Sequence, residues 1–484
     1  MSELIADRGD QGLRRLAAGT LLAAFQGTGA PEWVLRGLEN GLGGVTLFGF
    51  NITDADQLSA LTARLREAGD PVVSLDEEGG DVTRLAYHVG SPYPGNAALG
   101  AVDDVELTRR VYRAIGDELA GCGVTLDMAP AADVNTADDN PVIGTRSFGA
   151  DTALVVRHTV AAVRGLQSTG VAACVKHFPG HGATRQDSHL ELPVVDASRE
   201  LLRERELAPF RAAIEAGTRS IMTAHVRVPA VTGDAPATLS PAALTGLLRG
   251  ELGYDGVVVT DALDMRAVTD AYGLAGGAVL SLAAGADLLC LGPTPTSDDV
   301  RRIIDEIVAA VLDGRLPAAR LEEAAERVAR LRAWSGAPRT GGTEEKVIGL
   351  AAARRAVSLT GSAAPLVDPL VVEVDTPPTI AVGDVPWGFT PLPPRAEVVR
   401  VKPEAADVPD ILRRATGRSL VVVVKDAHRY ETSQSVVSAL LAARPDATVV
   451  EMGLPIWRPA GVTYLATYGA ARANAQAAAE LLGV

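Results

Sequence analysis

Eight short apolar runs, spaced at fairly even intervals, constrain the fold of this chain more than any other feature. Each run ends in polar or glycine residues and is followed by a stretch with helical periodicity. The runs are 19–25, 44–48, 71–75, 125–129, 171–175, 220–224, 256–260 and 286–291. Strands that alternate with helices and are apolar on both faces form parallel sheets, and eight of them favour a closed (β/α)8 barrel. An open doubly wound α/β sheet is the alternative.

The stretches between these runs have the pattern of amphipathic helices, and several begin with an Asp or Ser suited to an N-cap. They are 54–68, 103–122, 151–168, 198–216, 241–252 and 298–312. In a barrel, the loops after the carboxyl ends of the strands converge on one face and form the active site.

A change in composition after Trp334 divides the chain. Residues 335–343 are rich in Gly, Pro, Ser and Thr, which is typical of a linker. We predict a catalytic barrel domain over 1–335, a linker and connecting helix over 336–364, and a smaller α/β sandwich domain over 365–484. Its predicted strands are 366–374, 379–382, 419–424, 447–452 and 462–467, and its predicted helices are 408–416, 433–443 and 470–482. His428 is its only histidine, so we expect a structural or loop-donating role.

The acidic composition argues against two classes of partner. A formal net charge of -15 and a pI near 5.0 disfavour nucleic acid and anionic membranes, which both require a basic surface. The three cysteines, Cys122, Cys174 and Cys290, lie in or beside apolar runs and are expected to be free thiols in a reducing compartment. With neither a signal peptide nor a transmembrane segment evident, we expect a cytoplasmic protein, a monomer or weak homo-oligomer, that needs no metal or other cofactor.

Polar side chains follow the third to the seventh predicted strands. They are Asp76 to Glu78, Asp133 and Asn135, Lys176 and His177, His225, and Asp261. All of them are expected to meet at one mouth of the barrel, because they follow strands rather than precede them.

The densest of these clusters is Lys176-His177-Phe178-Pro179-Gly180-His181-Gly182, followed by Asp187-Ser188-His189. Its proline and glycines exclude a helix and predict a loop. A single histidine would favour a structural interpretation, but three within about a dozen residues favour chemistry. A metal hydrolase is the rival interpretation, since His177 and His181 are four residues apart; without a helix, that spacing does not align them as ligands.

Three further positions have side chains suited to a polar ligand. Asp261 follows a strand rich in β-branched residues and is either a nucleophile or the N-cap of the next helix. Asp76 precedes the paired glycines 79 and 80 and could accept hydrogen bonds from vicinal hydroxyls, although a solvated turn is the alternative. Arg146 lies in a glycine-bounded segment where its fork of donors would suit a polar ligand.

Together these segments closely resemble glycoside hydrolase family 3, in particular its bacterial β-N-acetylglucosaminidases of the NagZ type. The resemblance is strong over residues 15–335 and weak beyond them. Its most discriminating element is the segment from Lys176 to His189, which is similar to the loop that supplies a His–Asp dyad as acid/base in those enzymes. Family 3 glucosidases and xylosidases lack it and typically take a carboxylic acid from the later domain.

The resemblance implies a role for eight residues. Asp261 is the implied nucleophile, and His189, paired with Asp187, is the implied acid/base. The implied sugar-binding residues are Asp76, Arg84, Arg146, Lys176 and His177. Two positions depart from the commonest pattern: Asp81 replaces a frequent basic residue, and Ala262-Leu263 follow the nucleophile.

These roles predict a retaining exo-β-N-acetylglucosaminidase that forms a covalent glycosyl-Asp intermediate. Retention needs a nucleophile on one face of the sugar and a proton donor at the leaving oxygen, and an imidazole titrates close to working pH. The resemblance implies a small carbohydrate or muropeptide substrate, with a role in peptidoglycan recycling. Since a neutral imidazole does not repel an anion, a phosphorylase that releases N-acetylglucosamine 1-phosphate is an alternative. A broader family 3 β-glucosidase and a non-catalytic sugar-binding barrel are the others.

Overall fold

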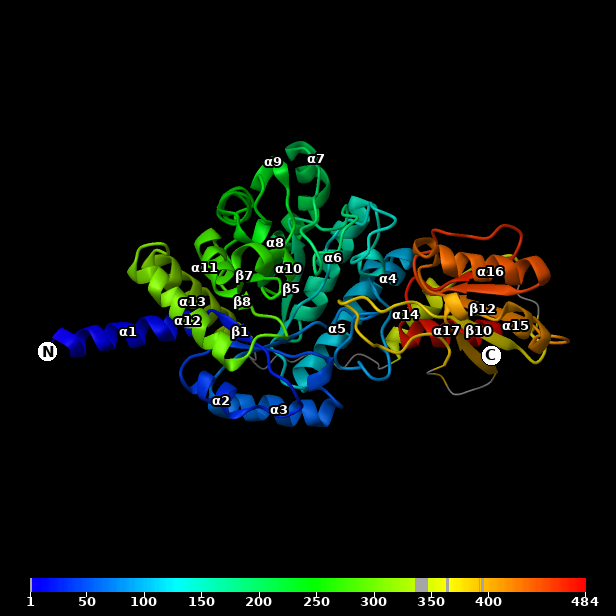
Figure 1. Cartoon of the computed structure of the whole chain (residues 1–484), viewed down its shortest axis with the longest axis horizontal. Coiled ribbons are helices and arrows are strands. Elements are labelled where there is room, and N and C mark those ends of the chain that lie inside the picture. Colours follow the sequence, from blue (N-terminus) through cyan, green and yellow to red (C-terminus); the bar gives the residue numbers. More distant parts are fainter. Residues whose placement is uncertain (1, 336–346, 363–364, 391, 393–395) are drawn as a thin grey trace.

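The computed structural model describes residues 2–335, 347–362, 365–390, 392 and 396–484, and their side chains from Asp10 onward. Two α/β domains lie next to each other along the long axis of the molecule (Figure 1). The first is a barrel of eight parallel strands, and the second is a six-stranded sheet covered by helices on both faces.

All eight predicted barrel strands are present. They are β1 (Leu21–Ala23), β2 (Gly44–Thr46), β3 (Val72–Leu75), β4 (Leu126–Asp127), β5 (Ala172–Phe178), β6 (Ser220–Thr223), β7 (Val257–Thr260) and β8 (Leu289–Cys290). Neighbouring strands pair in the order β7-β6-β5-β4-β3-β2-β1-β8, and a parallel bridge between Val259 and Leu288 brings the two ends together. The barrel prediction is therefore confirmed over the open-sheet alternative. Strand β5 is longer than predicted and contains Lys176 and His177, which we expected to follow it.

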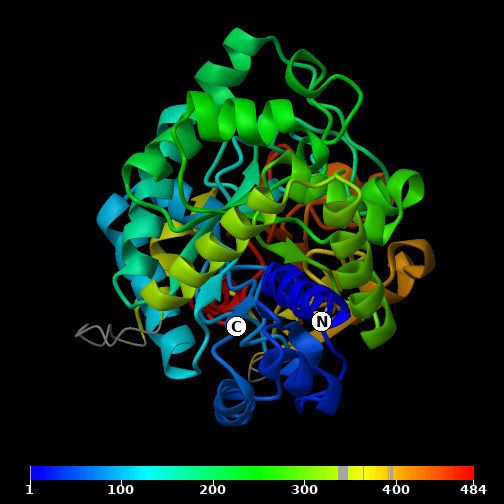
Figure 2. The same ribbon diagram turned by 90° about the vertical axis from the view of Figure 1, so that its left-hand side faces the viewer.

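Helices surround this sheet, as the view in Figure 2 shows. They are α1 (Ser2–Gly19), α2 (Glu32–Glu39), α3 (Ala55–Ala68), α4 (Asn96–Val102), α5 (Val105–Gly121), α6 (Thr152–Gln167), α7 (Arg199–Leu201), α8 (Leu207–Glu215), α9 (Pro229–Thr232), α10 (Arg266–Tyr272), α11 (Leu274–Ala284), α12 (Ser297–Leu312) and α13 (Ala318–Trp334). The π-helical segments η3 (Leu202–Glu206) and η5 (Ala242–Glu251) occupy parts of two predicted helices. Asp54, Asp104 and Asp151 cap α3, α5 and α6, each accepting a hydrogen bond from a first-turn amide.

No single helix in the described part of the chain is both long and apolar enough to cross a membrane, although the bent pair α10 and α11 meets the length and composition requirements when taken together.

The second domain is a three-layer α/β sandwich, as predicted. Its strands are β9 (Ser358–Thr360), β10 (Leu370–Val374), β11 (Glu397–Val401), β12 (Leu420–Val424), β13 (Thr448–Glu451) and β14 (Thr463–Ala466), in the order β11-β10-β12-β13-β14-β9. Only β9 is antiparallel to its neighbour among these described strands. The apolar residues of α15 (Val408–Arg414) and α16 (Glu431–Ala443) pack on one face of the sheet, and those of α17 (Arg472–Leu482) pack on the other.

Three details of the second domain differ from the prediction. Residues 379–382 are not a strand; they belong to a loop that leaves β10 and reaches the barrel. The sheet instead contains β9, which lies within the predicted linker and connecting helix over 336–364. It also contains β11, which sequence patterning missed because Glu397 and Arg400 interrupt its apolar residues. An edge strand tolerates such charges, since only one of its edges is paired.

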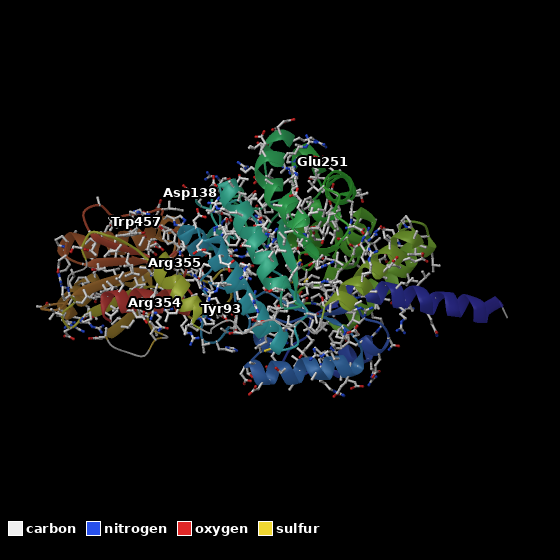
Figure 3. The ribbon with its side chains drawn as sticks, turned by 180° about the vertical axis from the view of Figure 1, so that it is seen from behind. Tyr93, Asp138, Glu251, Arg354, Arg355 and Trp457 are labelled. Carbon is white, nitrogen blue, oxygen red and sulfur yellow. The ribbon has the colours of Figure 1, made fainter. Side chains whose placement is uncertain are left out.

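Helix α14 (Ile348–Ala356) connects the two domains. Figure 3 labels its two arginines, of which Arg355 pairs with Asp104 of the barrel at 2.8 Å and Arg354 pairs with Glu480 of α17 at 2.7 Å. Gly349 is so close to the barrel that a Cβ there would lie 2.1 Å from the Pro92 carbonyl oxygen. Of the predicted linker and connecting helix over 336–364, residues 336–346 and 363–364 lie outside the described residues.

Candidate active site

A pocket of about 400 Å³ opens at the carboxyl ends of the barrel strands. Seven of the eight residues singled out in the sequence line it: Asp76, Arg84, Arg146, Lys176, His177, His189 and Asp261. The eighth, Asp187, contacts His189 from behind. The topology thus brings together residues that are up to 185 positions apart in the chain (76 to 261).

Asp261 follows the last residue of β7 and faces this pocket. It is not the N-cap of the next helix, because α10 begins at Arg266. Its backbone N–H donates to the Thr223 carbonyl, and its Oδ1 accepts from the Ala262 N–H at 2.8 Å. Burial alone would raise the pKa of the Asp261 carboxyl, but the nearby imidazoles of His225, His177 and His189 hold it below its ordinary value. The ionised carboxylate is therefore the favoured form of Asp261.

His189 and Asp187 form a hydrogen-bonded pair. The Asp187 Oδ1 lies 2.7 Å from His189 Nδ1 and also accepts the His189 backbone N–H at 2.9 Å. Burial works to raise the pKa of the Asp187 carboxyl, but the hydrogen bonds from His189 lower it overall. Since the carboxylate accepts the Nδ1–H, the other ring nitrogen, Nε2, is available to the pocket.

A network of four charged side chains forms the polar end of the pocket. Lys176 Nζ lies 2.5 Å from Asp76 Oδ1 and 2.7 Å from Glu78 Oε1. Arg146 donates hydrogen bonds to both oxygens of the same Glu78 carboxylate, from Nε at 2.9 Å and from Nη2 at 2.7 Å. Despite its burial, the pKa of Glu78 is far below its usual range because Arg146 and Lys176 face it. Glu78 thus fixes two predicted sugar-binding cations in place.

Glu78 was expected at the barrel mouth as part of the Asp76 to Glu78 cluster, but no role was predicted for it. One signal could have identified it. Two cations predicted to bind sugar, Arg146 and Lys176, need an acidic partner at the same mouth of the barrel. The role of Asp133 was missed in the same way: its Oδ2 lies 2.7 Å from His177 Nδ1, and its Oδ1 accepts the His181 N–H at 2.7 Å. With its Nδ1–H donated to Asp133, His177 accepts from Arg146 Nη2 through Nε2 at 3.2 Å.

His181 has a supporting role in the loop that carries His189. Its Nδ1 lies 2.7 Å from the Thr184 hydroxyl, and its Nε2 lies 3.1 Å from the Ser188 hydroxyl. Burial lowers the pKa of His181 to about 4, so its imidazole is neutral near pH 7. Both ring nitrogens are engaged, and within the described ranges no three His, Cys, Asp or Glu side chains form a metal-binding group. The geometry does not support the metal-hydrolase interpretation.

The second domain contributes directly to the pocket wall. Residues 380–383, in the loop after β10, line it together with the barrel residues. Arg84 connects the two parts, because its Nη2 donates to the Ala381 carbonyl oxygen at 3.0 Å and lies 3.8 Å from Asp76 Oδ2.

Asp81, one of the two departures from the family pattern, lies at the boundary between the domains. Its Oδ1 accepts the Ala470 N–H at 2.8 Å, and its Oδ2 accepts the Thr145 hydroxyl at 3.1 Å. Lys425 of the second domain lies 3.3 Å from Oδ2. An acidic residue is suitable here because the second domain supplies its cation and an amide donor.

Comparisons with known proteins agree with this geometry. Residues 30–331 match the family model described as "Glycosyl hydrolase family 3 N terminal domain". Over 319 residues the chain is 34% identical to "Beta-hexosaminidase A" of Pseudoalteromonas piscicida, covering 60% of this chain and 53% of that protein, so it spans about half of that relative's length. It is 35% identical over 292 residues to "Beta-hexosaminidase LpqI" of Mycobacterium tuberculosis, covering 58% of this chain and 73% of that protein.

A solved structure extends the similarity to both domains. This is a glycoside hydrolase family 3 β-N-acetylglucosaminidase from Paenibacillus sp. FPU-7, which is 35% identical. It superposes with a TM-score of 0.86 over 97% of this chain and 96% of that one.

Proposed function

The chain belongs to glycosyl hydrolase family 3, and on that premise we propose that it is a retaining exo-β-N-acetylglucosaminidase. The observation that carries this proposal is the pocket itself, which holds an ionised carboxylate, Asp261, and an imidazole, His189, that is backed by its own carboxylate. Retaining glycosidases need this combination of nucleophile and proton donor. The activity named for the curated relatives supports the choice of substrate.

The first chemical step forms a glycosyl-enzyme ester. Asp261 attacks the anomeric carbon while the protonated His189 Nε2 gives its proton to the departing glycosidic oxygen. Asp187 orients the ring through Nδ1 and stabilises the imidazolium. Asp76, Lys176 and Arg146 bind the hydroxyls of the sugar and hold its reacting carbon at Asp261.

The second step returns the enzyme to its starting state. Neutral His189 now removes a proton from water, which attacks the anomeric carbon and displaces the Asp261 carboxylate. Two inversions at the same carbon give overall retention of configuration. The polar end is closed by the buried Glu78–Arg146 pair, which favours removal of one terminal sugar rather than cleavage within a chain.

The decisive test is product analysis on β-linked N-acetylglucosaminides followed by NMR. We expect the β-anomer of free N-acetylglucosamine to appear first, before mutarotation. Initial release of the α-anomer, or no turnover of any β-N-acetylglucosaminide, would contradict the proposal. Running the reaction with and without inorganic phosphate distinguishes the hydrolase from the phosphorylase alternative, which would yield the 1-phosphate.

We also propose a cellular setting for this reaction. Cys122, Cys174 and Cys290 are buried free thiols, which supports a reducing compartment such as the cytoplasm. There the enzyme would remove N-acetylglucosamine from muropeptide fragments during peptidoglycan recycling, as a monomer or weak homo-oligomer. Accumulation of intact disaccharide muropeptides in cell extracts after deletion of the gene would support this role, and unchanged levels would contradict it.

A further inference from the structure

The wall of the catalytic pocket carries two exposed apolar side chains. Ile380 of the second domain is 59% exposed, and Phe50, in the turn η1 (Gly49–Asn51) after β2, is 38% exposed. Phe48 stacks on Phe50 with ring centroids 5.5 Å apart and lines the pocket as well. Apolar side chains left exposed together at a pocket commonly mark a place where a ligand covers them.

Tyr87 holds the Phe50 turn and the Ile380 loop together. A Cβ placed on Gly49 would lie 2.3 Å from the Tyr87 ring, and a Cβ placed on Gly383 would lie 2.7 Å from Tyr87 Oη, so the tyrosine packs against the backbone of both. Its Oη also accepts the Asp384 N–H at 3.0 Å. Glycine is needed at both contact points, and Gly383 has a φ of +72° as well.

Arg84 provides a second attachment for the same loop. It is buried, and it donates to the Ala381 carbonyl oxygen next to Ile380. The two attachments, at Ala381 and Asp384, lie on either side of residues 382–383 and fix the position of the loop relative to the barrel. Ile380 is therefore held at the pocket mouth by the barrel rather than by the second domain alone.

We infer that Ile380 and Phe50 form the aglycone site, where they contact the C–H face of a pyranose ring, and that Tyr87 and Arg84 are positioning residues for it. This inference rests on the proposed glycosidase function. The charged network takes the hydroxyls of the sugar that is transferred, so the group that departs must lie along the rest of the wall. Pyranose rings present apolar C–H faces, which pack well on aromatic and aliphatic side chains. The second domain then determines which leaving groups the barrel accepts.

The test compares two substrates that differ only in the departing group. One is the β-1,4-linked disaccharide of N-acetylglucosamine, and the other is methyl β-N-acetylglucosaminide. Both need protonation of the leaving oxygen. For Ile380→Ser we expect kcat/KM to fall about tenfold on the disaccharide and to change less than about twofold on the methyl glycoside. Ile456→Ser is the matched control, since Ile456 is an exposed isoleucine of the same domain outside the pocket, and it should alter neither value.

Tyr87→Phe tests the positioning role without disturbing the ring packing. Removing the hydroxyl releases the Asp384 amide, so we expect KM for the disaccharide to rise several-fold, with kcat on the methyl glycoside preserved. If Ile380→Ser left the ratio of the two kcat/KM values unchanged, through equal losses on both substrates or no loss on either, the inference would be overturned. If the wild-type enzyme hydrolyses neither glycoside, the proposed function fails instead, so the two failures are distinguishable.

Discussion

Both domains carry a carboxylate at the carboxyl end of a buried parallel strand, but the two groups are used differently. In the second domain, Glu451 at the end of β13 accepts three backbone amides, from Asp426, Ala427 and Gly453. In the barrel, Asp261 accepts one amide, from Ala262, among the described residues, and the carboxylate faces the pocket. A strand-end carboxylate is thus available for chemistry only where the local backbone leaves part of it unoccupied.

The same distinction holds for Glu373, the other buried acidic residue among the described residues of the second domain. Glu373 of β10 accepts hydrogen bonds from Phe389 N, Thr390 N and Arg400, which hold the returning chain against the sheet. In the barrel, Glu78 also binds only protein groups, but those groups are cations that line the pocket. Glu373 therefore holds a loop in place, whereas Glu78 fixes part of a charged binding surface.

The largest expected effect comes from exchanging carboxylate for amide in each domain. Asp261→Asn should lower kcat by about 10⁴-fold or more, because an amide cannot form the glycosyl ester. Glu451→Gln should leave kcat close to that of the wild type and lower the free energy of unfolding by about 1–3 kcal/mol, because an amide cannot satisfy three donors. Steady-state kinetics and urea denaturation of both variants measure this contrast. A strong loss of kcat in Glu451→Gln would break it.

The next effect concerns proton donation by His189. With a leaving group of low pKa, such as dinitrophenolate, no proton is needed in the first step, so His189→Ala should retain glycosylation at close to the wild-type rate. On the methyl glycoside we expect a loss of about 10²–10⁴-fold. Pre-steady-state and steady-state rates on the two substrates provide the measurement, and equal loss on both would contradict the assigned role.

Asp81 tests how the two domains depend on each other. Asp81→Ala removes the acceptor for the buried Ala470 N–H and the partner of Lys425, so the free energy of unfolding should fall by about 2 kcal/mol. Asp139→Ala is a control, because Asp139 pairs with Arg185 at the exposed surface and should contribute less than about 1 kcal/mol. Thermal unfolding of the two variants compares them. Equal melting temperatures would show that Asp81 does not stabilise the domain boundary.

The smallest expected effect is on pH dependence. The pKa of the Asp187 carboxyl is lowered, so its charge is present above its usual titration range and is lost only as the pH falls below it. That charge lies beside Nδ1 of His189, the proposed proton donor of the first step. Asp187→Asn should therefore shift the alkaline limb of kcat/KM to lower pH by about one unit. If the alkaline limb of the kcat/KM profile did not move, Asp187 would have no part in the acid/base function.

Much of the fold could be predicted because strand alternation and burial are local properties of the sequence. The eight barrel strands follow from apolar runs, and Asp261 and His189 follow from motifs at the ends of those runs. Glu78 and Asp133 were expected at the barrel mouth but were given no role, because their importance depends on partners about 44 to 98 positions away that only the barrel closure brings together. The stretch 379–382 has the composition of a strand, but Arg84 binds its Ala381 carbonyl and Tyr87 contacts the adjoining Gly383 and Asp384, which hold it as a loop.

The account depends most on covalent attachment of the sugar to Asp261. Incubation with a 5-fluoro analogue of N-acetylglucosaminyl fluoride slows the second step and allows the intermediate to accumulate, after which peptide mass spectrometry locates the label. We predict one labelled peptide, with the sugar on Asp261 and no labelling in Asp261→Asn. A label on any other side chain, or turnover with no labelled peptide because the 2-acetamido group itself attacks the anomeric carbon, would contradict the account.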